Sequence, residues 1–442
     1  MKTIELDGHG LTIEMVAGSA FASGTDVRLS EEAVARMRAS RAVVDRAVEN
    51  QAVVYGVTTG FGEFANVSIP PDKLGELQAN LIRSHAVGTG EEMPAEIVRS
   101  MMVLRINALA RGHSGIRVET VESLIAMLRA DILPMIPTQG SVGSSGDLVP
   151  LAHLVLGLMG EGECTVGGER HSASSALADA GVTPVRLAAK EGLALINGTQ
   201  MMTAYGSLAL SRMRQLLIAA DVIGVMSVEA LKGTDRAYDA RLHDARPHAG
   251  QILVAQNLRR LMQDSPLRES HREDDDRVQD AYSLRCIPQV HGASRTAFEH
   301  VRSILEVEIN SATDNPLIFS GEGEVVEGGN FHGQPVAVAL DYLAIASAEI
   351  ANISERRTER MVNGALSRLP RFLTTQGGLN SGLMIAQYTA AAIVSENKVL
   401  SHPASVDPLP TPATQQDHNP PGPPPPTHVP HTAAHASPAL AA

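Results

Sequence analysis

The 442-residue chain contains no tryptophan, and aromatic residues make up only 3% of it. Because aromatic and β-branched residues favour strands, a core built from Ala, Leu, Val, Ile and Met favours helix packing over a β-sandwich. Hydrophobic residues make up 44% of the chain, which is enough for a sizeable core. We therefore expect a mainly α-helical protein.

Cysteine, basic charge and long apolar runs are also scarce. Cys164 and Cys286 are the only cysteines, so a disulfide framework and a zinc site of several thiolates are excluded, and we expect a cytoplasmic protein without a metal. The net charge of −13 argues against a nucleic-acid partner. No stretch reaches the ~18 uninterrupted apolar residues of a membrane span, and we find no secretory signal.

Helical patterns recur along the chain. Ser30, followed by two glutamates, is a good helix start, and apolar residues keep a helical spacing over 34–48. The same spacing runs from Ser294 to Ile309. Pro335 stands where a first helical turn tolerates it, ahead of a long run over 336–357. Helices this long and this rich in apolar residues predict a long-helix bundle with a smaller, loop-rich N-terminal region.

Loops rich in Gly, Asn, Ser and Thr interrupt these helices, and loops held on rigid helices commonly carry functional sites. Four such segments are Tyr55–Gly62, Gly140–Gly146, Asn197–Thr199 and Gly328–Gly333. A fifth, charged segment, His271–Arg277, is typical of a solvated loop.

The composition predicts three parts. An N-terminal region over 1–200 carries the Gly140–Gly146 loop, and a central helical bundle covers 201–407. A tail over 408–442 is rich in Pro, Ala, His and Thr. Such a tail cannot bury enough apolar surface to order itself, so we expect it to be disordered.

The segment that starts at Gly140 carries the strongest motif. Taken alone, Gly-Ser-Val-Gly-Ser-Ser-Gly-Asp is an ordinary turn, with Asp147 capping a following helix. A phosphate-binding loop is a weaker alternative, because its Lys-Ser/Thr ending is missing. The run from Gly140 to His153, however, closely resembles the signature of the histidine and phenylalanine ammonia-lyase family. That family folds an Ala-Ser-Gly triplet into a methylidene-imidazolone (MIO) ring.

The resemblance spans the chain from about Val53 to His418, because separate motifs follow in the family's order. They are Val54–Gly62, Ser84-His85, Lys190–Gln200, Gln279–Cys286, Thr313–Pro316 and Gly329–His332. A constellation of this kind is very specific.

The resemblance implies a cofactor made by the chain from Ser144-Ser145-Gly146, with no external cofactor. To close the ring, the Gly146 amide nitrogen attacks the carbonyl carbon of residue 144, and a Cβ on residue 146 would obstruct that approach. Ser145 then loses water and leaves an electrophilic C=CH2. The family usually has Ala where this chain has Ser144, so the ring would carry a hydroxymethyl group.

The resemblance also implies the roles of the catalytic Tyr55 and the substrate-binding residues. Tyr55 takes the β-proton of the substrate, and because a free tyrosine has a pKa near 10, we infer that nearby dipoles or cations favour its phenolate. Arg285 pairs with the substrate carboxylate. Asn197 and Tyr282 contact the ring or the amino group, and Gln279 and Phe331 line the pocket.

Two positions bear on which aromatic amino acid is the substrate. His85 is at the substrate-side-chain position, which carries His in histidine- and tyrosine-acting members and disfavours phenylalanine. Gln416 replaces a Glu that is typical of histidine lyases, and phenylalanine-acting members carry Gln there. The run over 395–407 is similar to a histidine lyase. We predict conversion of L-histidine to trans-urocanate and ammonia, as in histidine catabolism.

Other functions stay open. The chain could act on tyrosine or phenylalanine, or as a 2,3-aminomutase that returns ammonia to the β-carbon. Family members are homotetramers with shared active sites, so we expect this assembly. After His418 the family continues into helices, whereas this chain has the Pro-rich tail. An inactive family member with an altered C-terminus is therefore a further alternative.

Overall fold

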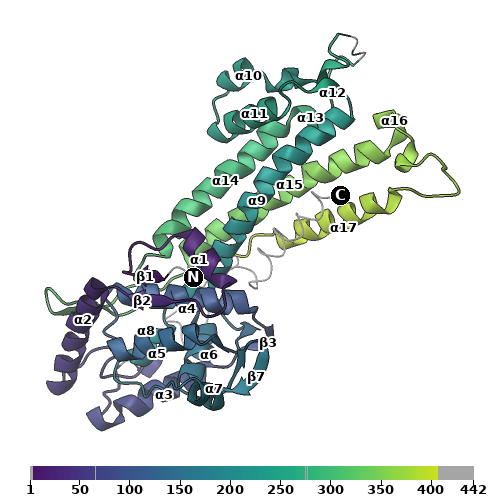
Figure 1. The fold of residues 1–442 in the computed structure, drawn as a ribbon. Helices are drawn as coiled ribbons and strands as arrows, with labels where there is room; N and C mark the ends of the chain where they lie inside the picture. Colours follow the sequence, from purple (N-terminus) through teal and green to yellow (C-terminus); the bar gives the residue numbers. More distant parts are fainter. Residues whose placement is uncertain (1–2, 65, 274, 276, 407–442) are drawn as a thin grey trace. The chain divides into compact units, whose positions relative to one another are not determined.

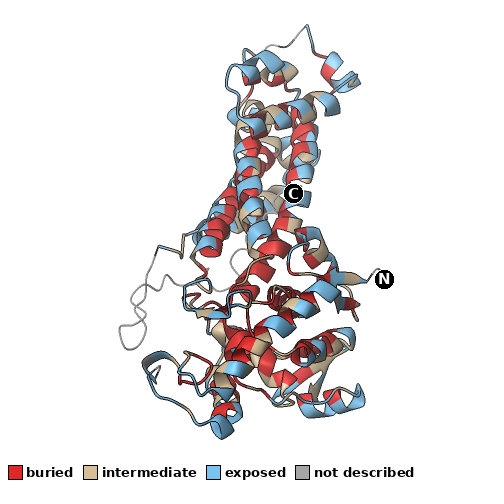
Figure 2. Cartoon of the chain, turned by 90° about the vertical axis from the view of Figure 1, so that its left-hand side faces the viewer, coloured by how far each residue is buried: buried red, intermediate tan, exposed pale blue. Residues whose placement is uncertain are grey.

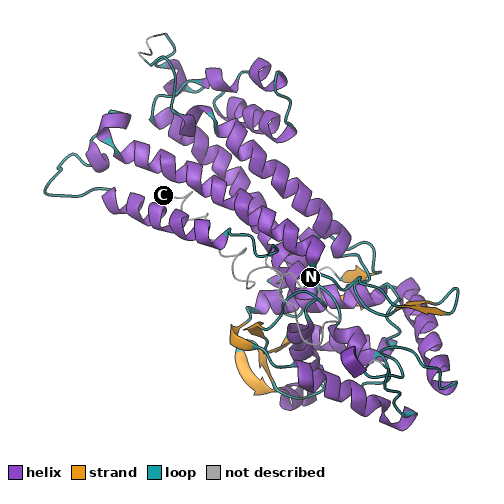
Figure 3. Ribbon diagram, turned by 180° about the vertical axis from the view of Figure 1, so that it is seen from behind, coloured by secondary structure: helices purple, strands orange, loops and turns teal. Residues whose placement is uncertain are grey.

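The computed structural model describes residues 3–406 apart from 65, 274 and 276, so the predicted tail over 408–442 and Gln416 lie outside the described residues. Within this part the chain forms seventeen α-helices, and every strand is four residues or shorter (Figure 3). The predicted mainly α fold is confirmed.

Packing divides the chain into two units. The described part of the first unit covers 3–208, 304–338 and 404–406, and the second covers 209–303 and 339–403. The long helices α9 (Gln200–Ala230), α14 (Ile287–Glu308) and α15 (Gln334–Val362) belong to both units.

The remaining helices of the first unit are α1 (Ile13–Ala20), α2 (Glu31–Glu49), α3 (Leu74–His85), α4 (Ala95–Ala110), α5 (Val118–Arg129), α6 (Leu148–Leu158), α7 (Ala173–Asp179) and α8 (Glu191–Ile196), with the short 3₁₀ helices Gly62–Phe64 and Pro71–Lys73. Its strands are β1 (Ile4–Leu6), β2 (Val27–Leu29), β3 (Thr89–Glu92), β4 (Ile132–Pro134), β5 (Pro137–Gln139), β6 (Glu163–Val166), β7 (Glu169–Ser172), β8 (Leu317–Phe319) and β9 (Glu324–Val326). β1 and β2 form a parallel pair. The other sheets are antiparallel: β3 pairs with β5, β8 pairs with β9, and β6 lies between β4 and β7 in a three-stranded sheet.

Local sequence explains where α2 begins. The Ser30 hydroxyl accepts a hydrogen bond from the Ala33 amide at 3.1 Å, and Glu31 and Glu32 lie in the first turn, where acidic side chains are favourable. Met37 and Val44 are buried on the predicted apolar face. The predicted helix start at Ser30 is confirmed.

Helix α4 is buried on all sides over most of its length, so it is a core helix of the first unit. Helices α3 and α8 both pack on α6, which begins directly after the Gly140–Gly146 loop. This packing provides the rigid support for that loop.

The second unit contains the long stretches of α9, α14 and α15, together with α10 (Ala240–Asp244), α11 (Ala249–Leu261), α12 (Pro266–Glu269), α13 (Tyr282–Arg285), α16 (Gly364–Ser367) and α17 (Met384–Leu400), and the 3₁₀ helices Asp235–Tyr238 and Arg371–Leu373. Within this unit the long helices run side by side with their buried residues on the inner faces (Figures 1 and 2). The Ser294 hydroxyl, for example, donates to the Ala346 carbonyl across α14 and α15.

Helix α15 starts with Pro335 in its first turn, as predicted. The helical spacing predicted from Ser294 to Ile309 falls almost entirely within α14, which runs from Ile287 to Glu308. By length and composition α15 could cross a membrane, but 72% of its apolar window is buried inside the protein. Core helices of water-soluble proteins have this property.

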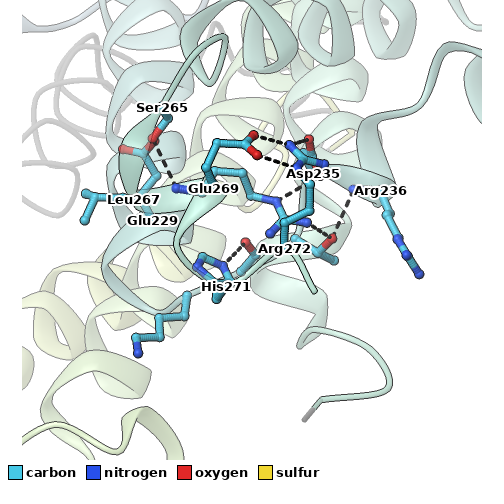
Figure 4. Close-up of polar contacts among 12 residues, drawn as sticks. Glu229, Asp235, Arg236, Ser265, Leu267, Glu269, His271 and Arg272 are labelled. Atoms are coloured by element: carbon cyan, nitrogen blue, oxygen red, sulfur yellow. Dashed lines mark hydrogen bonds and ion pairs between the residues drawn. The ribbon is translucent and has the colours of Figure 1, made fainter. Parts of the chain in front are cut away.

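The charged segment His271–Arg277 is a loop, as predicted, and Arg272 and Glu273 are exposed, but His271 departs from the prediction. His271 is buried, and its Nε2 lies 3.2 Å from the Gly233 carbonyl oxygen. Arg272 pairs with Asp235 and with Glu269 at 3.3 and 2.6 Å (Figure 4). His271 and Arg272 therefore connect this loop to Gly233 and Asp235, in the turn that follows α9.

Candidate active site

The Gly140–Gly146 loop folds back on itself between β5 and α6. The Gly146 amide donates to the Gly143 carbonyl at 3.3 Å, and the chain makes bridge-type contacts between Ser144 and Gly146. Ser144 is buried and Ser145 is half-buried. The backbone of the three residues of the predicted ring is therefore packed inside the first unit.

Gly146 occupies a place that no other residue could fill. Its φ is +70°, and a Cβ built on it would lie 2.1 Å from the Gly198 carbonyl oxygen. Such an approach is far below any van der Waals contact, so a side chain would displace one loop from the other. The loop at 197–199 thus presses directly on the predicted ring-forming triplet.

Asn197 connects the same two loops through its side chain. Its Nδ2 donates to the Ser145 carbonyl oxygen at 3.1 Å, and the residue is only 5% exposed. Its Oδ1 is buried without a hydrogen-bond partner in the described part of the chain. A buried polar atom without a hydrogen-bond partner costs free energy. Such atoms are commonly found where a ligand supplies the missing partner.

Arg105, on α4, makes several hydrogen bonds to the loop that carries Asn197. Its Nη1 donates to the Asn197 carbonyl at 3.0 Å and to Gln200 Oε1 at 2.7 Å, and its Nη2 donates to the Ala194 carbonyl. The side chain is fully buried, and burial lowers the pKa of its guanidinium to about 10. Arg105 is therefore still charged at neutral pH and makes charge-assisted hydrogen bonds to the loop.

Asp147 was expected to cap the helix that follows the Gly140–Gly146 loop. It lies at that N-cap position, but its carboxylate makes no hydrogen bond to α6. Oδ2 accepts instead from the Met201 and Met202 amides at 2.8 and 3.1 Å, at the start of α9. Burial raises the pKa of the Asp147 carboxyl to about 7, although these amides oppose the shift.

The loop that carries Phe331 also contacts the Gly140–Gly146 loop. The Gly333 amide donates to the Gly143 carbonyl at 2.9 Å, and Phe331 is half-buried. The structure therefore brings three of the four predicted glycine-rich loops together: those of Gly143, Asn197 and Phe331.

Tyr55 is half-buried in the remaining loop of the first unit. Burial raises the pKa of its phenol above the ordinary value, while a backbone hydrogen bond from Gly62 opposes the shift and the Glu327 carboxylate adds to it. The inference that the surroundings favour a phenolate is wrong for the single chain. Removal of water around the ring outweighs the one favourable backbone dipole.

His85 is the last residue of α3. Its Nδ1 lies 2.8 Å from the Leu81 carbonyl oxygen, which can only accept, so Nδ1 carries the proton. Burial lowers the pKa of His85, although this hydrogen bond opposes the shift. At neutral pH the imidazole is therefore uncharged, and Nε2 is an acceptor.

The three other described candidates belong to the second unit. Gln279 is exposed, and Tyr282 and Arg285 are the ends of α13. The Arg285 guanidinium carbon lies 4.5 Å from the centre of the Tyr282 ring, a cation–π geometry. Arg285 Nε is buried without a hydrogen-bond partner among the described residues.

Sequence reasoning missed Arg105. The available signal was a single arginine within the apolar stretch Met101–Ala110, since a charged residue in a buried helix needs partners. Among the described residues no group of three or more His, Cys, Asp or Glu could hold a metal ion.

Comparison with known proteins identifies the family. The model of the family described as aromatic amino acid lyase matches residues 11–429. A histidine ammonia-lyase from Caldanaerobacter subterraneus subsp. tengcongensis is 54% identical over 418 residues, covering 95% of this chain and 82% of the relative. A histidine ammonia-lyase from Deinococcus radiodurans is 55% identical over 395 residues, covering 89% and 75%.

Solved structures give the same result. The crystal structure of histidine ammonia-lyase from Trypanosoma cruzi is 48% identical with a TM-score of 0.88, covering 100% of this chain and 81% of that one. Tyrosine aminomutase from Streptomyces globisporus is 38% identical with a TM-score of 0.90, covering 99% and 85%. Sequence and structure agree over nearly the whole length, so this chain belongs to the aromatic amino acid lyase family and is a carbon–nitrogen lyase that releases ammonia.

Proposed function

We propose that the chain converts L-histidine to trans-urocanate and ammonia, with an MIO group formed from Ser144-Ser145-Gly146. The observation that carries this proposal is the contact between Gly146 and the Gly198 carbonyl, where only glycine fits. Ring closure through the Gly146 amide needs a residue without Cβ under close packing. The triplet and its neighbours therefore fit the group.

Ring formation balances as the loss of two waters. The Gly146 nitrogen bonds to the Ser144 carbonyl carbon, and that oxygen leaves with the amide hydrogens of Ser145 and Gly146. Ser145 then loses its hydroxyl and its Cα hydrogen, which leaves an exocyclic C=CH2. Once formed, the group supplies an electrophile that turns the substrate amine into a better leaving group.

The residues of the chain bind and orient the reactants. The Asn197 amide, which donates to the Ser145 carbonyl oxygen, withdraws electron density from the atoms of the triplet. Arg285 Nε, which is buried and has no hydrogen-bond partner among the described residues, is available to the substrate carboxylate. Tyr55 takes the β-proton, and because its pKa is raised in the single chain, it must fall when the substrate and partner subunits complete the site.

His85 supports a substrate that carries a hydrogen-bond donor on its side chain. Neutral His85 presents Nε2 as an acceptor, which suits an imidazole N–H or a phenol O–H but leaves phenylalanine without a partner. The names of the relatives favour imidazole over phenol. The other discriminating position, Gln416, lies outside the described residues.

We also propose a cytoplasmic homotetramer. Ile218, Val222 and Met226 lie on one face of α9, at four-residue spacing, and are 55%, 40% and 63% exposed. An apolar stripe of this kind favours burial against another subunit. Light scattering coupled to size-exclusion chromatography tests the assembly, and a monomeric, fully active protein would refute it. Both cysteines are free, which suits a reducing compartment.

The test of the function is incubation of the purified full chain with L-histidine, L-tyrosine and L-phenylalanine separately. We expect ammonia and trans-urocanate from L-histidine only, together with an intact mass that is two waters below the sequence mass. Ser145→Ala should abolish both. A β-amino acid product would indicate an aminomutase, and a folded, unmodified protein without product would indicate an inactive family member.

A further inference from the structure

Helix α13, which carries Tyr282 and Arg285, is a single turn with two opposite faces. Tyr282 is 71% exposed, whereas Leu284 is only 1% exposed and belongs to a core cluster of the second unit. A four-residue helix has little stability of its own, because nucleation costs more than its few hydrogen bonds return. The geometry of its exposed side chains must therefore come from contacts with the surrounding structure.

Tyr238 provides the first contact, at the C-terminal half of α13. Its ring is fully buried in the same core cluster as Leu284, and its hydroxyl donates to the Leu284 carbonyl oxygen at 2.9 Å. The carbonyl groups at the end of a helix lack the usual partners within the helix. At Leu284 the C-cap amide of Cys286 contacts the carbonyl, and the Tyr238 hydroxyl is a second donor from outside α13. Arg357 makes a longer contact with the neighbouring Ser283 carbonyl, at 3.4 Å.

Asp280 provides the second contact, two residues before α13. Its carboxylate accepts from the Thr234 amide at 2.6 Å, and its side chain is only 3% exposed. Arg277 lies 3.7 Å from the same carboxylate. This contact fixes the chain where it enters the helix.

Asp280 binds Thr234 in the turn at 233–235, and further polar contacts hold this turn in place. His271 contacts the Gly233 carbonyl, and Arg268 Nε donates to Asp235 at 2.9 Å. In Figure 4, Arg272 lies between Asp235 and Glu269 and pairs with both carboxylates.

We infer that Tyr238 and Asp280 are positioning residues that hold α13 so that Arg285 meets the substrate carboxylate. This inference rests on the proposed function. Neither side chain needs to touch the substrate: Tyr238 fixes the backbone beside Arg285, and Asp280 fixes the backbone before Tyr282. A guanidinium that is already oriented loses less freedom on binding, and therefore binds the carboxylate more tightly.

The test uses the full chain with Tyr238→Phe and Asp280→Ala. Each change removes one anchoring hydrogen bond, and we expect KM for L-histidine to rise about three- to tenfold with a smaller change in kcat. The inhibition constant of urocanate, which has a carboxylate, should weaken similarly. That of histamine, which lacks one, should stay unchanged. A merely structural defect would weaken both inhibitors.

Two variants act as controls. Asp280→Asn keeps an oxygen acceptor for the Thr234 amide and should recover most of the wild-type KM. Tyr342→Phe removes the hydroxyl of a part-exposed tyrosine on α15 of the same unit and should change nothing. Intact mass of every variant, two waters below the sequence mass, shows that ring formation is unaffected.

Hydrogen exchange of the peptide over 279–286 tests positioning without any turnover. We expect faster exchange in Tyr238→Phe and Asp280→Ala and wild-type exchange in the Tyr342→Phe control. Unchanged exchange and unchanged KM in folded variants, or equal weakening of urocanate and histamine, would overturn the inference. A wild-type protein that releases no ammonia would instead refute the proposed function, and the exchange result would still decide whether the two residues hold α13.

Discussion

The ring-forming loop of the first unit and helix α13 of the second are built in opposite ways. In the loop, backbone atoms are the proposed reactants, and they are buried and pressed against Gly198 without room for a side chain. In α13 the side chains are proposed to bind the substrate. Tyr282 is mostly exposed, while the Leu284 carbonyl of the same helix accepts a hydrogen bond from Tyr238. Backbone chemistry thus needs tight packing of the main chain, whereas ligand binding needs a fixed main chain beneath accessible side chains.

The largest effect is expected at Gly146. Gly146→Ala places a Cβ 2.1 Å from the Gly198 carbonyl at a φ of +70°, so we expect neither the loss of two waters nor any detectable ammonia release. Intact mass and an ammonia assay measure this. Gly18→Ala in α1 is the matched control, because nothing lies within 4 Å of its added Cβ, and it should be active. An active, ring-bearing Gly146→Ala protein would contradict the packing argument.

Removing Arg105 should destabilise the first unit. Arg105→Met leaves the Ala194 and Asn197 carbonyls and Gln200 Oε1 without their buried donor, so we expect the free energy of unfolding to fall by about 3 kcal/mol or more. Ring formation should also be incomplete, because the Asn197 loop would no longer be held. Urea denaturation and intact mass check the two effects. Wild-type stability would show that the loop does not depend on Arg105.

Asp147 should make stability depend on pH. Its folded pKa of about 7 lies above its ordinary value of 3.8, so its contribution is fully present below about pH 4 and is lost as the pH rises through 7. The free energy of unfolding should therefore fall over this window, by an amount on the order of a few kcal/mol from this group. Urea denaturation across the window should show a weaker decline in Asp147→Asn. An equal decline of the free energy of unfolding with pH in the wild-type protein and in Asp147→Asn would show that Asp147 is not the group responsible.

The smallest stability effect is expected in α13. Arg285→Lys removes the planar guanidinium but keeps the charge, so KM for L-histidine should rise about tenfold, while the free energy of unfolding changes by less than about 0.5 kcal/mol. Arg236→Lys, at an exposed arginine of the same unit, should change neither. Steady-state kinetics and urea denaturation measure the pair. A large loss of stability in Arg285→Lys would show that this side chain serves packing and not only ligand binding, against the contrast between α13 and the ring-forming loop.

Predictions from the sequence succeeded where the signal is local. Ser30 caps α2 and Pro335 opens α15, because a cap or a proline acts within one helical turn. They failed where the partner is distant. Asp147 accepts from Met201, 54 residues away, and His271 contacts Gly233, 38 residues away.

The amino-acid sequence alone was enough for the helical fold, for the Ser144-Ser145-Gly146 motif and for the family, because composition, helix periodicity and short motifs are properties of neighbouring residues. Only the tertiary structure decided which groups surround that motif. In the folded chain Arg105 donates to the Asn197 carbonyl, and the Asp147 carboxylate accepts from α9 where a cap on α6 was expected. The pKa of Tyr55 is raised, where the sequence led us to expect a lowered one. Burial and long-range hydrogen bonds control these properties, and both arise when distant segments pack together.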